Sequence, residues 1–184
     1  RNDEIAGSMK QYMRNQFDFF GIRAEERRAL CKEYLNLHPL PERKELHKII
    51  KELWNFDERE LHYFAMELFM KSKKYWTVED VLLLEYLVTH KSWWDTVDFL
   101  AAQIAGSWFK KYPDQIKAIS EKWNRSENIW LQRTSILFQL KYKNETDLKL
   151  LTKYITQLNS SKEFFIQKVS PALVTIILND LAEF

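Results

Sequence analysis

"WLQRTSIL" at residues 130–137 and "FIQKVSPA" at residues 165–172 decide the fold, because they are two copies of one pattern. At an offset of 35 residues, Trp130 aligns with another aromatic residue and Arg133 aligns with Lys168. Such self-similarity at a fixed spacing is the sequence signature of a repeat architecture.

The same step continues toward the start of the chain. Trp94 lies 36 residues before Trp130, a further 35 residues lead to Arg59, and 36 more lead to Arg23. A period near 35 residues with two helices in each period is typical of a helical solenoid. We therefore expect an all-α, alpha-alpha superhelix in which the aligned helices line one concave side and form a groove.

Apolar residues recur at helical spacing along nearly the whole chain. Helix-start signals support the pattern, among them Pro41, Thr77 and Pro113. We expect helices at about 3–19, 24–38, 42–53, 57–72, 78–89, 93–110, 113–123, 127–141, 146–158 and 161–178.

The composition also favours helices and one domain, residues 1–184. The chain is 46% hydrophobic, and its 3 glycines and 4 prolines are too few for the turns of a many-stranded β protein. The net charge of +2 neither demands nor excludes nucleic acid. No stretch has the length and apolarity of a membrane helix, and Cys31 is the one cysteine, so we expect a cytoplasmic protein without a membrane partner.

Trp94 and Asp98, in "KSWWDTVDFL" (91–100), are four residues apart and share a face of the expected helix. A carboxylate on a partly buried face is costly, so it should be paired or have a chemical role. The alternative is an aspartate near a helix start that the helix dipole favours, beside a core tryptophan. Asp95 fits that alternative well, whereas Asp98, one turn further in, fits it less well.

Arg133 lies on or beside the apolar stripe of its helix, four residues after Ile129 and three before Ile136. An arginine at this place can reach a phosphate or a carboxylate. It can equally extend from the edge of the stripe into solvent.

Lysines close several expected helices, in "MKSKK" (70–74), "THK" (89–91), "FKK" (109–111) and "KYK" (141–143). If these helices stack in parallel, the lysines, Lys91 among them, collect on one rim and form a phosphate-binding edge. Compensation of the helix dipole at each C-terminus explains the same lysines one at a time. Only their collection on one rim favours the phosphate-binding hypothesis.

Motifs for cofactor chemistry are missing from the sequence. The four histidines form no pair at metal-ligand spacing, and the chain has neither a glycine-rich phosphate loop nor a GxSxG turn. We expect no metal and no cofactor, and we interpret Cys31 as a small core residue.

Five phrases together resemble the AlkD-type DNA alkylation repair glycosylases over about residues 8–168: "FFGIRAEERR", "ELWNFDEREL", "VTHKSWWDTVD", "NIWLQRTSILFQLKYK" and "SSKEFFIQK". This resemblance implies HEAT-like helical repeats with a basic concave groove for double-stranded DNA. It also implies a monofunctional DNA glycosylase, a hydrolase that excises positively charged N3- and N7-alkylated purines without a metal. A monomer associated with the bacterial nucleoid follows from the same resemblance.

The resemblance assigns roles to particular residues. Asp98 matches the catalytic aspartate, Trp94 an aromatic residue that packs on the sugar of the damaged nucleotide, and Arg133 an arginine near the DNA backbone. A carboxylate at this place would stabilise the oxocarbenium-like sugar. Together with the repeat and lysine patterns, the resemblance gives these expected DNA contacts: Tyr12, Arg23, Arg59, Lys91, Trp130 and Lys168.

The C-terminal end departs from the family. Ala172 stands where the family has a second groove tryptophan, Pro171 interrupts the expected helix, and no Lys or Arg occurs in residues 169–184. We expect the C-terminal helices typical of the family to be lacking, through truncation or through a divergent end. Two alternatives to the enzyme follow: a catalytically inactive DNA-binding relative, and a protein scaffold.

Overall fold

The computed structural model describes residues 1–168, and in that part of the chain every regular element is a helix. The expected all-α class of helical repeats is therefore confirmed. Packing divides the chain into two compact units, Arg1–Tyr75 and a second that begins at Trp76. Ala172, Pro171 and the rest of residues 169–184, for which the sequence predicts a departure from the family, lie outside the described residues.

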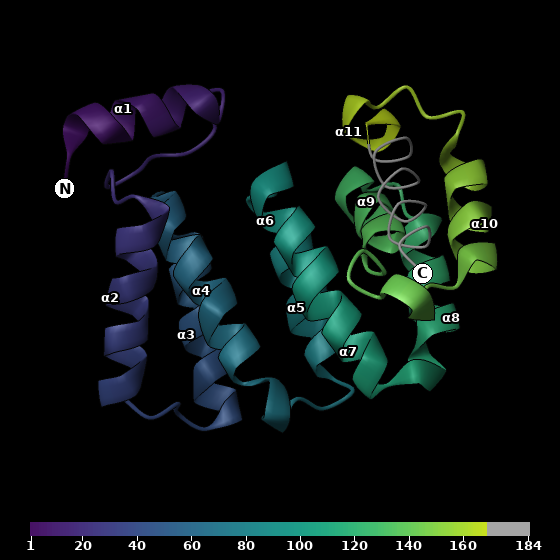
Figure 1. Ribbon diagram of the computed structural model, residues 1–184, viewed down its shortest axis with the longest axis horizontal. Helices are drawn as coiled ribbons and strands as arrows, with labels where there is room; N and C mark the ends of the chain where they lie inside the picture. Colours follow the sequence, from purple (N-terminus) through teal and green to yellow (C-terminus); the bar gives the residue numbers. More distant parts are fainter. Residues whose placement is uncertain (169–184) are drawn as a thin grey trace. The chain divides into compact units, whose positions relative to one another are not determined.

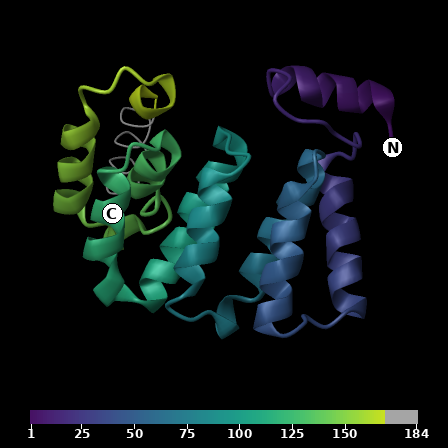
Figure 2. The ribbon, with the colours of Figure 1, turned by 180° about the vertical axis from the view of Figure 1, so that it is seen from behind.

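Figure 1 and, from behind, Figure 2 show the order of the helices. The first unit contains α1 (Asp3–Tyr12), α2 (Ala24–Leu37), α3 (Arg43–Asn55), α4 (Arg59–Lys71) and the short η1 (Lys73–Tyr75). The second unit contains α5 (Asp80–Thr89), α6 (Trp94–Phe99), η2 (Leu100–Ala105), α7 (Gly106–Lys111), η3 (Pro113–Gln115), α8 (Ile116–Asn124), α9 (Ile129–Leu137), η4 (Lys143–Glu145), α10 (Leu148–Leu158) and α11 (Phe164–Gln167).

In the first unit, α2 and α3 both pack against α4, and α1 lies across the end at which α2 and α4 begin (Figures 1 and 2). Trp54 and Ile50 of α3 are fully buried, and the Trp54 ring packs against His62 of α4 with a centroid distance of 5.0 Å. Burial of side chains this large removes much apolar area from water and holds the helix pair together.

The second unit has an aromatic core. Phe109 of α7 is fully buried between Trp123 of α8, at 5.4 Å between ring centroids, and Phe138, at 4.7 Å. Gly106, at the start of α7, lets the helix approach the chain at Phe138 closely, because a Cβ there would lie 2.5 Å from the Phe138 carbonyl oxygen. The core thus joins α7, α8 and the end of α9.

Side chains cap the starts of some helices, α9 and α10 among them. The side chain of Asn128 accepts hydrogen bonds from two backbone N–H groups at the start of α9, and Asp147 accepts one at the start of α10. The Asp80 carboxylate accepts from the backbone N–H of Thr77 at 2.6 Å and from its hydroxyl at 3.1 Å. These local signals explain why helix starts could be read from the sequence.

The repeat of about 35 residues appears as contacts between elements one period apart. The hydroxyl of Tyr142 donates to the carbonyl of Gly106, 36 residues earlier, and Ser120 shares a hydrogen bond with Tyr154, 34 residues later. In the first unit, Lys71 donates to the carbonyl of Leu35, also 36 residues away. Successive helix pairs therefore bond through equivalent positions.

The expected helix over 3–19 is wrong in its second half. It ends at Tyr12, because Arg14 and Asn15 adopt left-handed backbone conformations with φ of 54° and 58°. The expected helix over 127–141 also stops early, at Leu137. Within the described residues, the last expected helix is seen only as α11.

The single helix expected over 93–110 is three joined segments. Between α6 and α7, the residues Leu100–Ala105 form a π-helix, a wider turn that does not break the rod. Five of its six residues are buried, so packing against neighbouring helices stabilises the π-helix.

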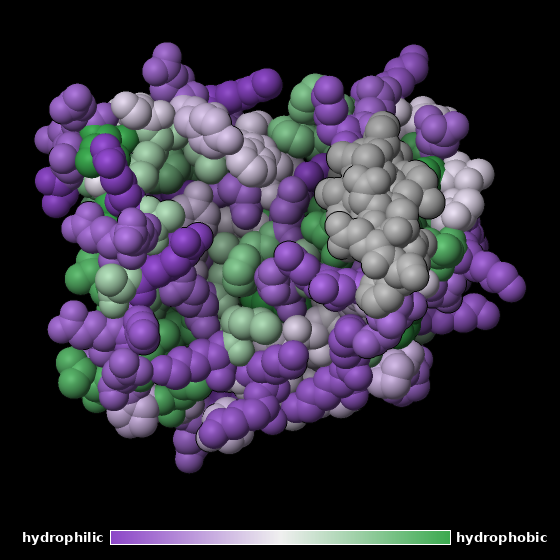
Figure 3. Space-filling model, in the orientation of Figure 1, coloured by the Kyte–Doolittle hydropathy of each residue, from purple (hydrophilic) through white to green (hydrophobic). Residues whose placement is uncertain are grey.

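Hydrophilic side chains cover most of the face shown in Figure 3, with smaller apolar areas between them. None of the helices in residues 1–168 combines the length and apolarity needed to span a membrane.

Candidate functional site

Trp94 and Asp98 both lie within α6, which confirms that they belong to one helix and share a face. Trp93 is the N-cap residue, so the paired tryptophans of "SWWD" mark the start of this helix. Both Trp94 and Asp98 are partly exposed. A carboxylate at this place can be reached from solvent.

Asp98 is paired with Arg133 of α9, 35 residues later. The Arg133 Nε donates to one carboxylate oxygen at 2.6 Å, and Nη2 donates to the other at 2.7 Å. The side chain of Arg133 is only 10% exposed, whereas that of Asp98 is 35% exposed. The interpretation of Arg133 as an arginine that extends into solvent is therefore wrong, because its guanidinium is buried against the carboxylate.

A third donor of Arg133 ties the site to α11. Its Nη1 donates to the backbone carbonyl of Phe165 at 2.5 Å. Three helices, α6, α9 and α11, thus meet at one guanidinium, and the planar bidentate geometry fixes the orientation of Asp98. A bidentate pair accepts only one hydrogen bond on each carboxylate oxygen, so each oxygen keeps a further lone pair.

Aromatic rings cluster beside this pair. The centroid of Phe165 lies 5.0 Å from that of Trp93 and 5.0 Å from that of Trp130, and the two tryptophan rings are 6.0 Å apart. The indole N–H of Trp93 is buried without a hydrogen-bond partner among the described residues. We call Trp93, Trp130 and Phe165 the aromatic cluster.

Sequence reasoning missed Trp93 and Phe165 as members of the site. The repeat contained the signal for Phe165, because it aligns with Trp130. The dipeptide Trp93–Trp94 contained no signal about which indole joins the cluster, since that depends on where α6 begins.

The other expected contacts of the second unit lie near the ends of helices. Lys91 follows α5 in a left-handed conformation with φ of 46°, and it is half-buried. Lys168 is exposed at the end of α11, with its Nζ 5.6 Å from the centroid of the Phe164 ring. Trp130 belongs to the aromatic cluster.

The expected single rim of lysines is wrong within the second unit. Lys91 follows the last turn of α5, whereas Lys111 at the end of α7 donates to the carbonyl of Trp76, just before the start of α5. The two lysines lie at opposite ends of α5, because α5 and the α6–α7 rod run in opposite directions. The expected rim required that the helices ending in lysines run in the same direction, and these two do not.

In the first unit, Tyr12 at the end of α1 is 70% exposed and Arg23 is the exposed N-cap residue of α2. Arg59 differs, because it is fully buried. Its guanidinium stacks 3.7 Å from the centroid of the Phe17 ring and donates to Nδ1 of His62 at 2.9 Å. The expected DNA contact at Arg59 is therefore wrong, because a fully buried guanidinium cannot reach a phosphate.

Cys31 is buried in α2, as expected for a core residue. Burial and the neighbouring Glu67 raise the pKa of its thiol to about 11. No group of three or more His, Cys, Asp or Glu side chains that could hold a metal ion occurs in residues 1–168.

The fold and the site define an all-helical repeat protein in which three helices present one arginine-held carboxylate beside a cluster of aromatic rings. The sequence model of the DNA alkylation repair enzyme family matches residues 1–170 of this chain. The chain belongs to the DNA alkylation repair enzyme family, and this membership supports a role in the repair of alkylated DNA.

A solved structure agrees with this assignment. The chain is similar to a protein described as a predicted DNA alkylation repair enzyme from Enterococcus faecalis, with a TM-score of 0.87 and 32% sequence identity. The similarity covers 100% of this chain and 84% of that one. No match was found among curated proteins.

Proposed function

We propose that the protein is a monofunctional DNA glycosylase that excises positively charged N3- and N7-alkylated purines from double-stranded DNA. The observation that carries the proposal is the Asp98 carboxylate, which is 35% exposed and is oriented by the buried Arg133. Family membership supports DNA as the substrate.

The positive charge of the lesion is opposite to the negative charge of the Asp98 carboxylate. An N7- or N3-alkylated purine carries a positive charge, so it leaves as a neutral base when it takes the electron pair of the glycosidic bond. This departure needs no general acid, and positive charge then develops on the sugar. A fixed carboxylate stabilises that charge and orients the water whose oxygen bonds to C1′, while the released proton passes to the carboxylate or to solvent.

In this proposal Arg133 acts through Asp98. Its three donors already bind the carboxylate and the Phe165 carbonyl, so it serves as a positioning residue and holds the carboxylate in one orientation. The expectation from the resemblance, a contact near the DNA backbone, would use the N–H groups that remain on the two terminal nitrogens.

Aromatic residues supply the remaining surface. Trp94 shares the face of Asp98 on α6, and an indole there packs on the sugar and attracts a cationic base through its π face. The aromatic cluster holds the start of α6 in place, because Trp93 is the N-cap residue of this helix and packs against Trp130 and Phe165. Exposed Arg23 and Lys168 and half-buried Lys91 are the proposed phosphate contacts, and Tyr12 is a proposed contact in the first unit.

The test is the release of 7-methylguanine from a methylated duplex, with the enzyme in excess over the DNA. The wild-type protein should release the free base and leave an abasic strand that breaks only on treatment with alkali, as expected without a lysine nucleophile. Asp98→Asn should lose release while it keeps DNA binding. Asp114→Asn, the same change at an exposed aspartate of η3, is the matched control and should keep the wild-type rate.

DNA binding without base release by the wild-type protein would favour the inactive DNA-binding relative instead. Absence of DNA binding at low salt would favour the protein scaffold. Equal release by wild type and Asp98→Asn would reject the assigned role of the carboxylate.

A further inference from the structure

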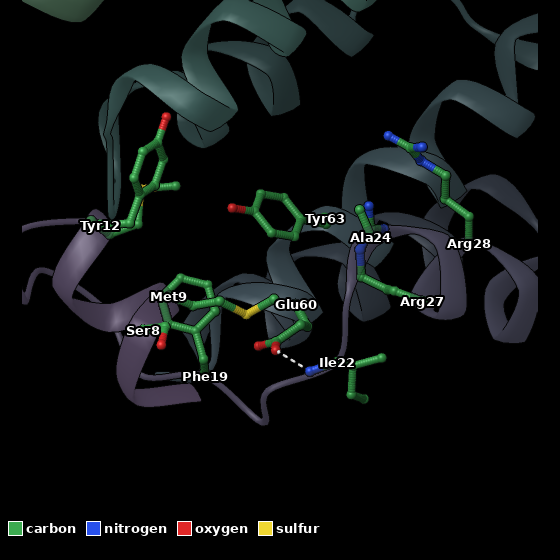
Figure 4. Close-up of a pocket in the computed structure, with 11 residues that line it drawn as sticks. Ser8, Met9, Tyr12, Phe19, Ile22, Ala24, Arg27, Arg28, Glu60 and Tyr63 are labelled. Atoms are coloured by element: carbon green, nitrogen blue, oxygen red, sulfur yellow. Dashed lines mark hydrogen bonds between the residues drawn. The ribbon is translucent and has the colours of Figure 1, made fainter. Parts of the chain in front are cut away.

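The first unit contains a pocket of about 470 Å³ between α1, the loop that follows it, α2 and α4. Pockets that hold one small ligand are usually about 300–1,000 Å³. Figure 4 shows the Tyr63 ring in the middle of the pocket, with Tyr12 on one side and Arg27 and Arg28 on the other. None of the residues of the site around Asp98 lines it.

Flat and flexible apolar groups form most of the pocket surface. Tyr12 and Met9 come from α1, Phe19 from the following loop and Tyr63 from α4. Tyr12 is 70% exposed, so its ring is accessible at the edge of the pocket. Aromatic rings and methionine side chains are surfaces on which a planar ring stacks without a sequence-specific hydrogen bond.

The base of the pocket is rigid. The buried Glu60 carboxylate accepts three backbone hydrogen bonds from consecutive residues of the loop before α2: Phe20 at 3.1 Å, Gly21 at 3.0 Å and Ile22 at 3.2 Å. These bonds use the acceptor capacity of the carboxylate on the side of the loop and fix the backbone there. The pocket therefore exists before a ligand arrives.

One exposed cation, Arg28, lies at the pocket and can bind an anionic group. Arg27 pairs with Glu67 and lies 4.9 Å from the centroid of the Tyr63 ring, so its charge is partly neutralised. Arg28 is exposed and forms no ion pair within residues 1–168. A ligand with a planar apolar part and one anionic group would satisfy both the rings and Arg28.

We propose that this pocket binds one unpaired nucleotide of a DNA strand, with the neutral base among Tyr12, Tyr63 and Met9 and a flanking phosphate at Arg28. The proposal rests on DNA as the substrate of the proposed function. It differs from the site of Asp98 in the group it offers, because its exposed charge is the cation Arg28, whereas the exposed charge at the other site is a carboxylate. The pocket therefore takes an unpaired base that carries no charge, and not the cationic lesion.

The test uses undamaged DNA, so its result does not depend on excision. The dissociation constants of the full chain are measured by fluorescence anisotropy for three duplexes at one salt concentration. One duplex is fully paired, one has a single bulged adenine, and one has a bulged tetrahydrofuran without a base. We expect roughly tenfold tighter binding of the adenine bulge than of the other two, as for one stacked base.

Two variants with matched controls locate the effect. Ser8→Trp places an indole in the pocket from an exposed position of α1, and Gln11→Trp adds the same group to the same helix outside the pocket lining. Arg28→Gln removes the charge at the pocket, and Lys32→Gln removes an exposed charge one turn further along α2. Ser8→Trp should abolish the preference for the adenine bulge, Arg28→Gln should weaken it several-fold, and both controls should retain it.

Equal binding of the three duplexes by the wild-type protein would overturn the pocket proposal, and so would a preference that survives both Ser8→Trp and Arg28→Gln. Because Arg28→Gln changes an exposed residue, it remains informative if Ser8→Trp does not fold. Release of 7-methylguanine by the wild-type protein together with equal binding would reject the pocket and leave the proposed function in place. A preference for the adenine bulge without release of 7-methylguanine would support the pocket and reject the proposed function.

Discussion

Asp98 and Arg133 show at the scale of single residues how the repeat creates chemistry. Neither residue is unusual in its own helix, and the pair forms because α6 and α9 are one period apart and pack together. The sequence predicted both as candidates. It could not predict that they bind each other, since the pairing depends on the side-chain directions of two helices that are 35 residues apart.

Arg133→Lys tests the positioning role. Lysine keeps the charge but cannot donate two parallel hydrogen bonds to a carboxylate, so Asp98 loses its fixed orientation. We expect the single-turnover rate constant for 7-methylguanine release to fall roughly 10- to 100-fold, with little change in DNA affinity. Arg125→Lys, at an exposed arginine paired with Glu121, is the control and should change neither quantity. A parallel loss of DNA affinity in Arg133→Lys would indicate a phosphate contact instead.

Cys31 gives a prediction about reactivity. Because its pKa is raised to about 11, the reactive thiolate is scarce, and burial restricts access to it. At pH 8 the thiolate fraction falls from about a quarter for an ordinary thiol to about a thousandth for Cys31. Iodoacetamide should therefore label the native protein slowly and the protein in guanidinium chloride rapidly, as mass spectrometry can measure. Equal labelling rates would show that the thiol is accessible in the folded state.

At the scale of elements, the long α6–η2–α7 rod links the site to the core. The π-helix lies between Asp98 and Gly106 in the chain. Because Gly106 packs tightly against Phe138, the π-helix determines the direction in which the side chain of Asp98 leaves α6. Helical spacing predicted a helix over this region, but it gave no sign of the wider turn, because the apolar residues Leu100–Ala105 suit either kind of helix.

Two glycines provide a matched test of this packing. In Gly106→Ala the new Cβ meets the Phe138 carbonyl oxygen at 2.5 Å, so the backbone must shift and stability should fall by about 1–3 kcal/mol. In Gly7→Ala the Cβ meets nothing within 4 Å inside α1, so stability should rise by about 0.5–1 kcal/mol. Urea denaturation measures both, and a neutral Gly106→Ala would contradict the close approach of α7 to Phe138.

The loop after α1 shows where element prediction failed. Apolar residues continue at helical spacing past Tyr12, yet Arg14 and Asn15 turn the chain and Glu60 holds the following loop. Glu60 lies about 40 residues further along, so no local pattern announces it. The burial of Arg59 has the same origin, because its ring partner Phe17 belongs to this loop.

At the scale of the whole molecule, the seven tryptophans divide between stability and the site. Trp54, Trp108 and Trp123 are fully buried and Trp76 nearly so, whereas Trp93, Trp94 and Trp130 lie at the site and are half-buried. The composition indicated that the tryptophans needed an explanation, but only the fold separates these two groups.

DNA affinity should depend on salt in proportion to the few proposed phosphate contacts. With about three such contacts, Arg23, Lys91 and Lys168, a fourfold rise in salt concentration from 50 to 200 mM should weaken binding about 40-fold. Fluorescence anisotropy with an undamaged duplex measures this slope. Affinity that is independent of salt would mean that the proposed cations do not contact phosphates.

If the carboxylate of Asp98 stabilises the charge that develops on the sugar, its removal must lower the rate constant of excision. Single-turnover release of 7-methylguanine is measured for the wild-type protein and for Asp98→Asn, each at protein concentrations that saturate the DNA. We expect a loss of at least about 100-fold in Asp98→Asn, as for the removal of one charge-stabilising group. Release by Asp98→Asn within a few-fold of the wild-type rate would contradict it.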